Sequence, residues 1–320
     1  MGGDHKAGQY SSADPASAVR PYLVRGDPGA GAVEAWSGYP LQFGGQRRFA
    51  WQDAMAADLR QELSQLPAAP GTVLAGRYLS TDLARCDVEN RLFANPGAAS
   101  FPKGVTAVRF ERGTGPLPCP PVPVGRVAGH LHYYSYCLGE AWRSWEPAAL
   151  LARWQRVTRR APDDGSCRPV WLAMKAAAAA GKVEVLAPRL PASAEFGVRV
   201  VIHATSRGPR QAAAVSETVV DGIIAAFHAG LGHGAVASAV AAALASRLPG
   251  MTVPELEAFI AGSEPGPLFA SSAFVVKGTY VQISPCDDRC QVGEVIIRPD
   301  ADGQYPQISG ELFTLRRTPT

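Results

Sequence analysis

The sequence predicts an α+β fold with a mixed, largely antiparallel sheet and several amphipathic helices. Helical and strand-like segments are interspersed, and the strand-like segments cluster instead of alternating regularly with helices. The chain closes with three strand-like runs in succession, at 275–284, 290–300 and 307–317, which favours antiparallel pairing over a doubly wound parallel sheet. No internal repeat is visible at any period.

Length and composition predict one large folded domain. The 320 residues are 47% hydrophobic and 18% charged, which is enough apolar material to bury a core. Residues 1–20 are small and polar and are expected to form a flexible tail, so that the α+β domain spans 21–320. The proline-rich loop at 113–125 and the loop at 206–215 are the two places where this domain could be subdivided.

The first strong helix signal lies at 52–67. Met55, Leu59, Leu63 and Leu66 follow one another at spacings of four, four and three residues, which places them on one face of a helix. A proline after the last of them ends this helix. Short apolar runs predict strands at 72–79, 105–112, 127–137, 182–188 and 197–205.

Five further helices are predicted from residue 146 onward. Pro147 is tolerated in the first turn of the first of them. Ser216 is positioned to cap a helix that ends near Gly230. Thr252 and Glu255 have the spacing of a capping box. The predicted helices cover 146–157, 170–181, 216–230 and 235–248, and the last begins after residue 252.

Charge and composition restrict the class of protein. The formal net charge of +3 is too small to indicate nucleic-acid binding by field strength alone. The bias toward Arg, Ala, Gly and Pro is typical of GC-rich bacterial genomes. The N-terminal segment lacks the apolar core of a secretion signal, and the longest apolar run, 235–245, is shorter than the roughly 20 residues that cross a bilayer. A bacterial, cytoplasmic protein without a membrane partner is therefore expected.

The CDVEN stretch is the first candidate for a metal site. Asp87 and Glu89 are two residues apart, so on a strand both carboxylates point to the same face. Carboxylate oxygens are the ligands that hard divalent ions prefer. Alternatively, Arg85 and Arg91 neutralise the pair at the surface, where ion pairs are common and weak.

Two further acidic positions extend this candidate site. Asp221 lies beside the apolar stripe of its predicted helix, and Gly222 lets another backbone or a ligand come close. Alternatively, Asp221 stabilises the positive end of its own helix. Asp288 belongs to the SPCDDRC stretch at 284–290, which is predicted as the tip of a hairpin, with a metal-facing carboxylate as the alternative.

Together, the Asp-x-Glu-Asn element, the helix aspartate and the later Asp-Asp pair resemble the acidic pattern of RusA-like Holliday junction resolvases. The lysine that this family carries one turn before the helix aspartate is absent, and about 130 residues separate Glu89 from Asp221. The chemistry in question is a Mg²⁺ or Mn²⁺ ion on Asp87, Glu89, Asp221 and Asp288. Such an ion orients a water molecule and neutralises charge that develops on a phosphate.

A basic surface is expected near such a site, to bind nucleic acid or another polyanion. On the predicted helix at 146–157 and just after it, Arg153, Arg156 and Arg160 gather away from the apolar stripe, where arginines hold phosphates, and Trp154 offers a ring for base stacking. Alternatively, the arginines complement the helix dipole and the tryptophan belongs to the core.

Two histidines suggest a different phosphoesterase. His132 and His203 each lie on a predicted strand, and their surroundings are similar to the paired HxT/HxS motifs of the 2H phosphoesterases. Tyr134 stands where the first motif has Ser or Thr. The alternative is that each histidine is hydrogen-bonded to a neighbour inside the sheet.

Two classes of function therefore stay open. The first is a divalent-metal-dependent hydrolase that acts on a phosphodiester or nucleic-acid substrate. The second is a non-catalytic binding or assembly protein, whose Trp/Arg-rich helix and proline-rich loop form a surface for a protein partner. Convergence of the acidic residues in space is the observation that distinguishes the two.

Overall fold

A computed structural model of the chain provides the structure. Residues 1–18 of the predicted tail, and 206–210 of the loop predicted as a possible boundary, lie outside the residues that it describes. The described residues are 19–69, 71–139, 141–161, 164–205, 211–248, 250–262, 264–277, 280–300 and 303–318.

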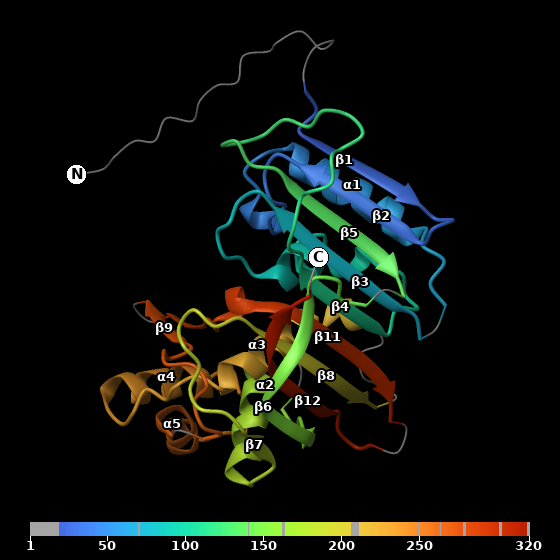
Figure 1. The fold of residues 1–320 in the computed structure, drawn as a ribbon. Coiled ribbons are helices and arrows are strands. Elements are labelled where there is room, and N and C mark those ends of the chain that lie inside the picture. The colour runs from blue at the N-terminus through green and yellow to red at the C-terminus, as the bar shows by residue number, and fades with distance from the viewer. Residues whose placement is uncertain are drawn as a thin grey trace, which may run out of the picture.

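The α+β fold class is confirmed by a ten-stranded mixed sheet that runs through the whole molecule (Figure 1). Its strands are β1 (Tyr22–Asp27), β2 (Ala32–Ser37), β3 (Val73–Ser80), β4 (Ala107–Arg112), β5 (His132–Leu138), β6 (Trp145–Thr158), β7 (Val183–Val185), β8 (Phe196–Ala204), β11 (Cys290–Pro299) and β12 (Gln307–Arg317). Their order is β1-β2-β5-β3-β4-β11-β8-β12-β6-β7. Only β3–β4 and β8–β11 are parallel neighbours. β9 (Phe274–Lys277) and β10 (Tyr280–Ile283) pair separately.

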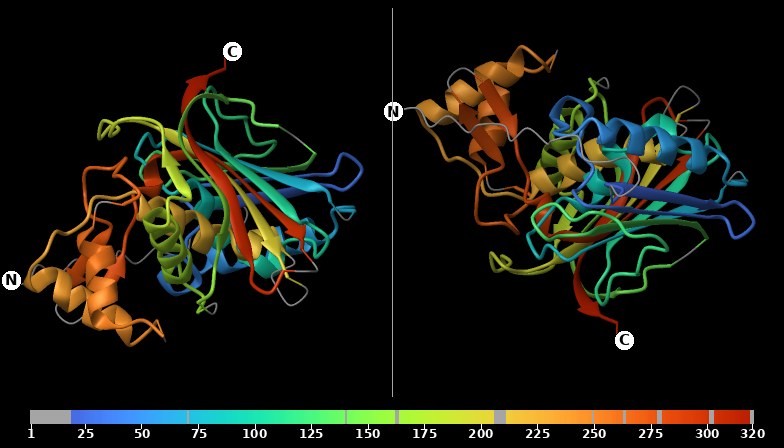
Figure 2. Two further views of the ribbon diagram at one scale, coloured as in Figure 1. Left: turned by 90° about the horizontal axis from the view of Figure 1, so that it is seen from below. Right: turned by 90° about the horizontal axis from the view of Figure 1, so that it is seen from above.

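The helices form a layer on one face of this sheet (Figure 2). They are α1 (Trp51–Ser64), α2 (Arg168–Ala179), α3 (Ser216–Ala226), α4 (Ala235–Ala245) and α5 (Val253–Ala261). Helices α4 and α5 pack on each other at one end of the layer, and α4 also contacts β10. The capping box at the start of α5 is formed as predicted, since the side chains of Thr252 and Glu255 bond reciprocally to the backbone.

The core lies between the helical layer and the sheet. The predicted stripe at 52–67 is the buried face of α1, because Met55, Leu59 and Leu63 are fully buried and Leu66 nearly so. The sheet supplies the facing side chains from alternate positions of its strands, as the pleat requires. None of the helices in the described part of the chain is both long and apolar enough to cross a membrane.

The sheet consists of two halves with the same topology, which meet at the antiparallel pair β4–β11. The first half runs β2, α1, β3, β4, β5 and the second runs β6, α2, β8, β11, β12. Outward from the junction, the strand orders β4-β3-β5-β2 and β11-β8-β12-β6 correspond one to one. In the first half the connection between the two parallel strands holds a short π-helical turn, η2 (Asn90–Ala94), and a 3-10 turn, η3 (Ala98–Ser100). In the second half it holds the helices α3 to α5 and the β9–β10 pair. The repeat is one of topology, without a visible sequence period.

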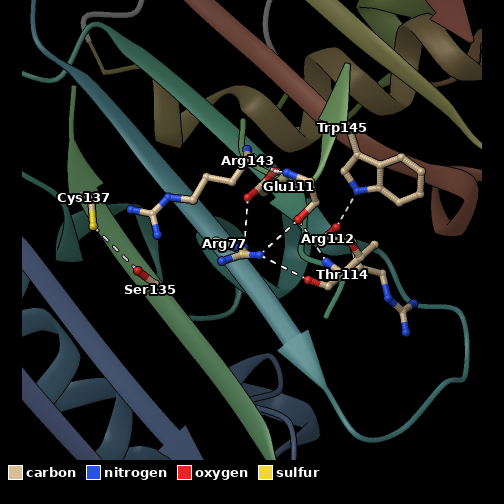
Figure 3. A network of polar contacts seen from close by, with 9 residues as sticks. Arg77, Glu111, Arg112, Thr114, Ser135, Cys137, Arg143 and Trp145 are labelled. Atoms are coloured by element: carbon tan, nitrogen blue, oxygen red, sulfur yellow. Dashed lines mark hydrogen bonds and ion pairs between the residues drawn. The ribbon is translucent and has the colours of Figure 1, made fainter. Parts of the chain in front are cut away.

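A polar network on the other face of the sheet fastens the second half of the chain to the first (Figure 3). The Nε of Arg77 on β3 lies 3.0 Å from a carboxylate oxygen of the buried Glu111 on β4. The other oxygen of Glu111 accepts the backbone N–H of Arg143 at 2.9 Å. Trp145, the first residue of β6, donates its indole N–H to the carbonyl of Arg112 at 2.6 Å. The chain that enters the second half is therefore held on β4.

The helix predicted at 146–157 is wrong, because this segment is the strand β6. Its pairing with β12 is interrupted by register shifts near Gly310 and Phe313. A bulge of this kind adds a residue to one strand and changes the phase of the alternation. The apolar residues of β6 therefore recur at three- and four-residue spacings that imitate a helix.

The hairpin formed by β1 and β2 was not predicted from the sequence at all.

Trp154→Ala tests the position of this tryptophan in the core. The Trp154 side chain is 2% exposed, lies beside Gly310 on β12 and contacts the ring of Phe227 at 6.0 Å between centroids. We expect the substitution to lower the free energy of unfolding by about 3–5 kcal/mol, as measured by chemical denaturation. Arg153→Ala is the control, because its exposed ion pair with Glu184 is worth at most about 1 kcal/mol. If both substitutions lowered the free energy of unfolding equally, the burial of Trp154 would be contradicted.

Candidate metal centre

The candidate centre lies at the end of the sheet where β3 and β4 end and β8 and β11 begin. A cavity of about 540 Å³ opens there. It is lined by the two connections that join the parallel strands of the two halves and by the loop after β2. The polar residues of its wall include Asp87, Asn90, Arg91, Glu217, Asp221 and Asp287.

Three aspartates converge in this cavity. One carboxylate oxygen each of Asp87, Asp221 and Asp287 lies within 4.8 Å of the other two. Divalent ions bind oxygen ligands at about 2.0–2.6 Å, so ligands of a single ion are on the order of 4–5 Å apart at most. The three carboxylates are therefore spaced closely enough for one Mg²⁺ or Mn²⁺ ion.

Asp87 is positioned by the turn that follows it. Its carboxylate accepts the backbone N–H of Asn90 at 3.0 Å and the side-chain amide of the same residue. The amide oxygen of Asn90 is buried and has no hydrogen-bond partner among the described residues. A π-helical turn widens the backbone and is frequent at functional sites. This one holds the Asp87 carboxylate in place and leaves a buried, unpaired amide oxygen next to it.

Asp221 is brought to the cavity by the packing of α3 on α2. A Cβ at Gly222 would lie 2.6 Å from the carbonyl oxygen of Cys167 and from Val170, so only glycine allows the two helices to approach this closely. The Asp221 carboxylate itself has no hydrogen-bond donor in the part of the chain that the structure describes. A buried carboxylate without a donor is costly unless a proton or a cation is bound to it.

Asp287 lies in a short 3-10 turn, η5 (Asp287–Arg289), directly before β11. His228, just beyond α3, holds this segment: its Nε2 accepts the backbone N–H of Cys286 at 3.1 Å, and its Nδ1 donates to the carbonyl of Ser271 at 2.8 Å. Burial lowers the pKa of His228, which keeps the ring neutral and able to accept. The third carboxylate is therefore fixed by backbone contacts.

Burial together with mutual repulsion controls the charge of the centre. Burial first, and then the charge of Asp87, raises the pKa of Asp287 to about 8. Burial raises the pKa of Asp87 as well, and burial followed by repulsion from Asp287 raises that of Asp221 well above its ordinary value. Among the described residues none of the three forms an ion pair with Lys or Arg. Without a cation, protons must offset part of the negative charge.

Glu89 lies beside this group but is not part of it. The prediction that Asp87 and Glu89 share a face assumed a strand, whereas the chain there begins a helical turn, in which residues two apart point in different directions. Glu89 is buried and accepts a hydrogen bond from the hydroxyl of Ser216, and burial raises its pKa well above the ordinary value. The Ser216 hydroxyl therefore donates to Glu89 and does not cap α3, because the N-cap residue of this helix is Val215.

Asp288 is also outside the group of three, and its neighbour Asp287 occupies the position expected for it. The hairpin predicted at 284–290 is wrong, because β10 pairs with β9 whereas β11 lies at the centre of the large sheet. The segment instead leads the chain from β10 into β11 of the large sheet, and on the way it passes close to α3. Successive residues of its turn point in different directions, and the sequence contains no signal that distinguishes one aspartate of the pair from the other.

The predicted Trp/Arg surface is not formed. Trp154 is buried in the core, Arg153 pairs with Glu184, and Arg156 lies 2.7 Å from Asp300. Arg160 lines a separate apolar cavity between α2 and α5. The proline-rich loop at 113–125 packs on the sheet, where the carbonyl of Pro118 accepts the indole N–H of Trp36 at 2.9 Å.

The two histidines do not form a joint site. His132 on β5 lies 2.7 Å from the hydroxyl of Tyr78 on the helical side of the sheet, and burial lowers its pKa to about 4. His203 on β8 contacts Ser309 at 3.1 Å and points to the other face, because its neighbour Ile202 belongs to the core. Three strands separate β5 from β8. The geometry implied by the 2H phosphoesterase resemblance is absent for this pair.

No family model matches the chain, and no curated protein or solved structure is significantly similar to it. The arrangement offers three hard oxygen ligands in a polar cavity, with Glu89 and Glu217 close by and Arg91 on the wall. Such a set can bind a divalent cation and place an anionic group beside it.

Asp287→Asn tests the buried charge through the pH dependence of stability. In the metal-free protein the folded state keeps a proton on Asp287 up to about pH 8, whereas the unfolded state releases it near the ordinary value of 3.8. The free energy of unfolding of the wild type, relative to the variant, is therefore expected to fall as pH rises between these values. Chemical denaturation in EDTA at a series of pH values measures this difference, and a difference that is constant or rises with pH would contradict it.

Proposed function

We propose that the protein is a divalent-metal-dependent hydrolase of phosphodiester bonds, with Mg²⁺ or Mn²⁺ bound by Asp87, Asp221 and Asp287. The observation that carries this proposal is the convergence of three half-buried carboxylates from distant parts of the chain, none of them paired with a basic side chain among the described residues. Natural folds seldom bury like charges together without a compensating ion, because the desolvation cost is several kcal/mol per group.

The neighbouring thiols favour a hard oxygen-ligated ion over zinc. Burial raises the pKa of Cys86, and burial raises those of Cys167 and Cys286 to about 12. A thiol must lose its proton to bind a soft metal or to act as a nucleophile. None of these cysteines belongs to the group of described residues whose ligand atoms converge. The aspartates are therefore the proposed ligands, and Mg²⁺ or Mn²⁺ is the ion that suits them.

Arg91 is the residue best placed to bind the phosphate. It lines the same cavity, and its Nη1 is oriented by the carbonyl of Leu41 at 2.9 Å. It also hydrogen-bonds Cys86 but has no carboxylate ion pair within the described residues, so the N–H groups that these two contacts leave over can bind phosphate oxygens. A bound ion would supply a polarised water molecule and neutralise the developing charge. The aspartates would hold that ion, and Arg91 would orient the phosphate beside it.

Metal binding is tested by thermal unfolding in increasing concentrations of Mg²⁺ or Mn²⁺. A ligand that binds only the folded state raises the melting temperature, and we expect this rise in the wild type. Asp221→Asn is expected to remove it, because it deletes one of three ligands. Asp288→Asn is the matched control, since its carboxylate lies outside the group of three, and it should behave like the wild type. A wild type without any shift at millimolar metal would contradict the proposal.

Catalysis is tested with an activated diester such as bis(p-nitrophenyl) phosphate. Hydrolysis should require Mg²⁺ or Mn²⁺ and stop in EDTA. Asp287→Asn should lower kcat/KM by more than about 10-fold, since even residues that merely support a metal ligand contribute this much. Asp288→Asn again serves as the control. Activity that survives in EDTA, or that depends on Asp288 instead of Asp287, would refute the assignment of the ligands.

A further inference from the structure

The cavity of the metal centre continues into two further hollows, one on either side. One, of about 280 Å³, shares Gln42 and Arg91 with it and also contains Arg85 and His130. The other, of about 360 Å³, shares Glu217 and Asp221 with it. A depression that extends past the reacting position in both directions suits a polymer, which enters at one end and leaves at the other. Arg85 and Arg91 place positive charge along one arm.

The loop at 38–50, called here the rim loop, forms one wall of the central cavity and of the first hollow. It is held rigidly in spite of lacking regular strands. The backbone N–H of Leu41 donates to the buried hydroxyl of Tyr134 at 2.8 Å, and its carbonyl accepts the side-chain amide of Asn95 at 2.8 Å. The buried Gln52 accepts two backbone N–H groups of the loop and donates to the carbonyl of Pro40 at 2.9 Å. The side chains at its tip are thus presented on a fixed backbone.

Phe43 is one of the side chains at this tip. It lines the cavity of the three aspartates and is 44% exposed. An exposed aromatic ring at the mouth of a polar cavity has no role in the core, and leaving it in water forfeits the gain of burial. A rigid loop that keeps such a ring beside a phosphate-binding site provides a flat apolar surface for a ligand.

A row of aromatic rings continues from the rim loop. Tyr39 contacts Phe49 edge-on at 5.4 Å, and Phe49 stacks on Trp51 at 5.7 Å. The guanidinium of Arg48 lies 5.5 Å from the centre of the Tyr39 ring. All four side chains are partly or fully accessible to solvent. Aromatic faces interleaved with arginine are typical of surfaces that bind single-stranded nucleic acid, where bases stack and phosphates meet positive charge.

We propose that the substrate of this centre is a nucleic-acid strand with an unpaired base next to the scissile phosphate, and that Phe43 stacks on that base. The inference rests on the proposed function and narrows its substrate class. In a duplex each base is covered on both faces by its neighbours, so a ring at a fixed position can stack only on a base that is free of its pair. Arg91 contacts the phosphate, and the rim loop sets the position of the base.

Binding of a short fluorescently labelled single-stranded oligonucleotide, followed by anisotropy with Ca²⁺ and again with EDTA, tests the stacking. Phe43→Ala should weaken binding by about 5- to 100-fold, the range expected for the loss of one base–aromatic stack. Phe43→Trp should keep the affinity. Tyr305→Ala is the matched control, because Tyr305 is a comparably exposed ring, 41% accessible, and is not among the residues that line the three cavities. A blunt duplex of the same sequence should bind more weakly and be insensitive to Phe43.

The outcomes separate this inference from the proposed function. Phe43 is not one of the three converging ligands, so Phe43→Ala should keep the rise in melting temperature with Mg²⁺ or Mn²⁺. Equal oligonucleotide affinity of Phe43→Ala and wild type would overturn the stacking while metal-dependent hydrolysis of the small diester stood. Duplex binding as tight as single-strand binding would overturn it too. Oligonucleotide binding that depends on Phe43, in a protein that hydrolyses no diester with any metal, would support the stacking and refute the hydrolase.

Discussion

Carboxyl groups that are half-buried close together repel one another, and this repulsion controls the charge of the candidate metal centre. Asp87, Asp221 and Asp287 meet in a cavity where no basic partner among the described residues offsets their charge. Their pKa values rise because burial and proximity both favour the protonated forms. The folded chain keeps this arrangement because the backbone around each carboxylate is fixed by hydrogen bonds and helix packing elsewhere. A cation that replaced the protons would turn an unfavourable cluster into a favourable one.

The topology explains why the aspartates meet at all. Parallel neighbours in a sheet cannot be joined by a tight turn, so their connections must cross over the sheet. The two parallel pairs lie on either side of the β4–β11 junction, and both connections lie on the helical side. Asp87 lies in one connection, and Asp221 and Asp287 lie in the other. Residues some 130–200 positions apart in sequence thereby line one cavity.

The sequence predicted what depends on local pattern. The stripe of α1 and the capping box of α5 have spacings that only a helix satisfies, and Asp87 and Asp221 were identified as candidate ligands. The strand β6 was predicted as a helix because its bulges break the two-residue alternation. Asp288 was chosen in place of Asp287 because the direction of a side chain in a short turn depends on the strand that follows. The rim loop was missed, since the exposure of Phe43 is a property of the fold.

The likeness of the two halves has a further consequence. A dimer of identical subunits joined at one ladder would present every feature twice, related by a two-fold axis, and would treat both orientations of a bound molecule alike. In this chain the equivalent connections have diverged in length and content, since one holds two short helical turns and the other holds three α-helices and the β9–β10 pair. The cavity between the two connections is consequently asymmetric, and a molecule that binds along it has a defined orientation.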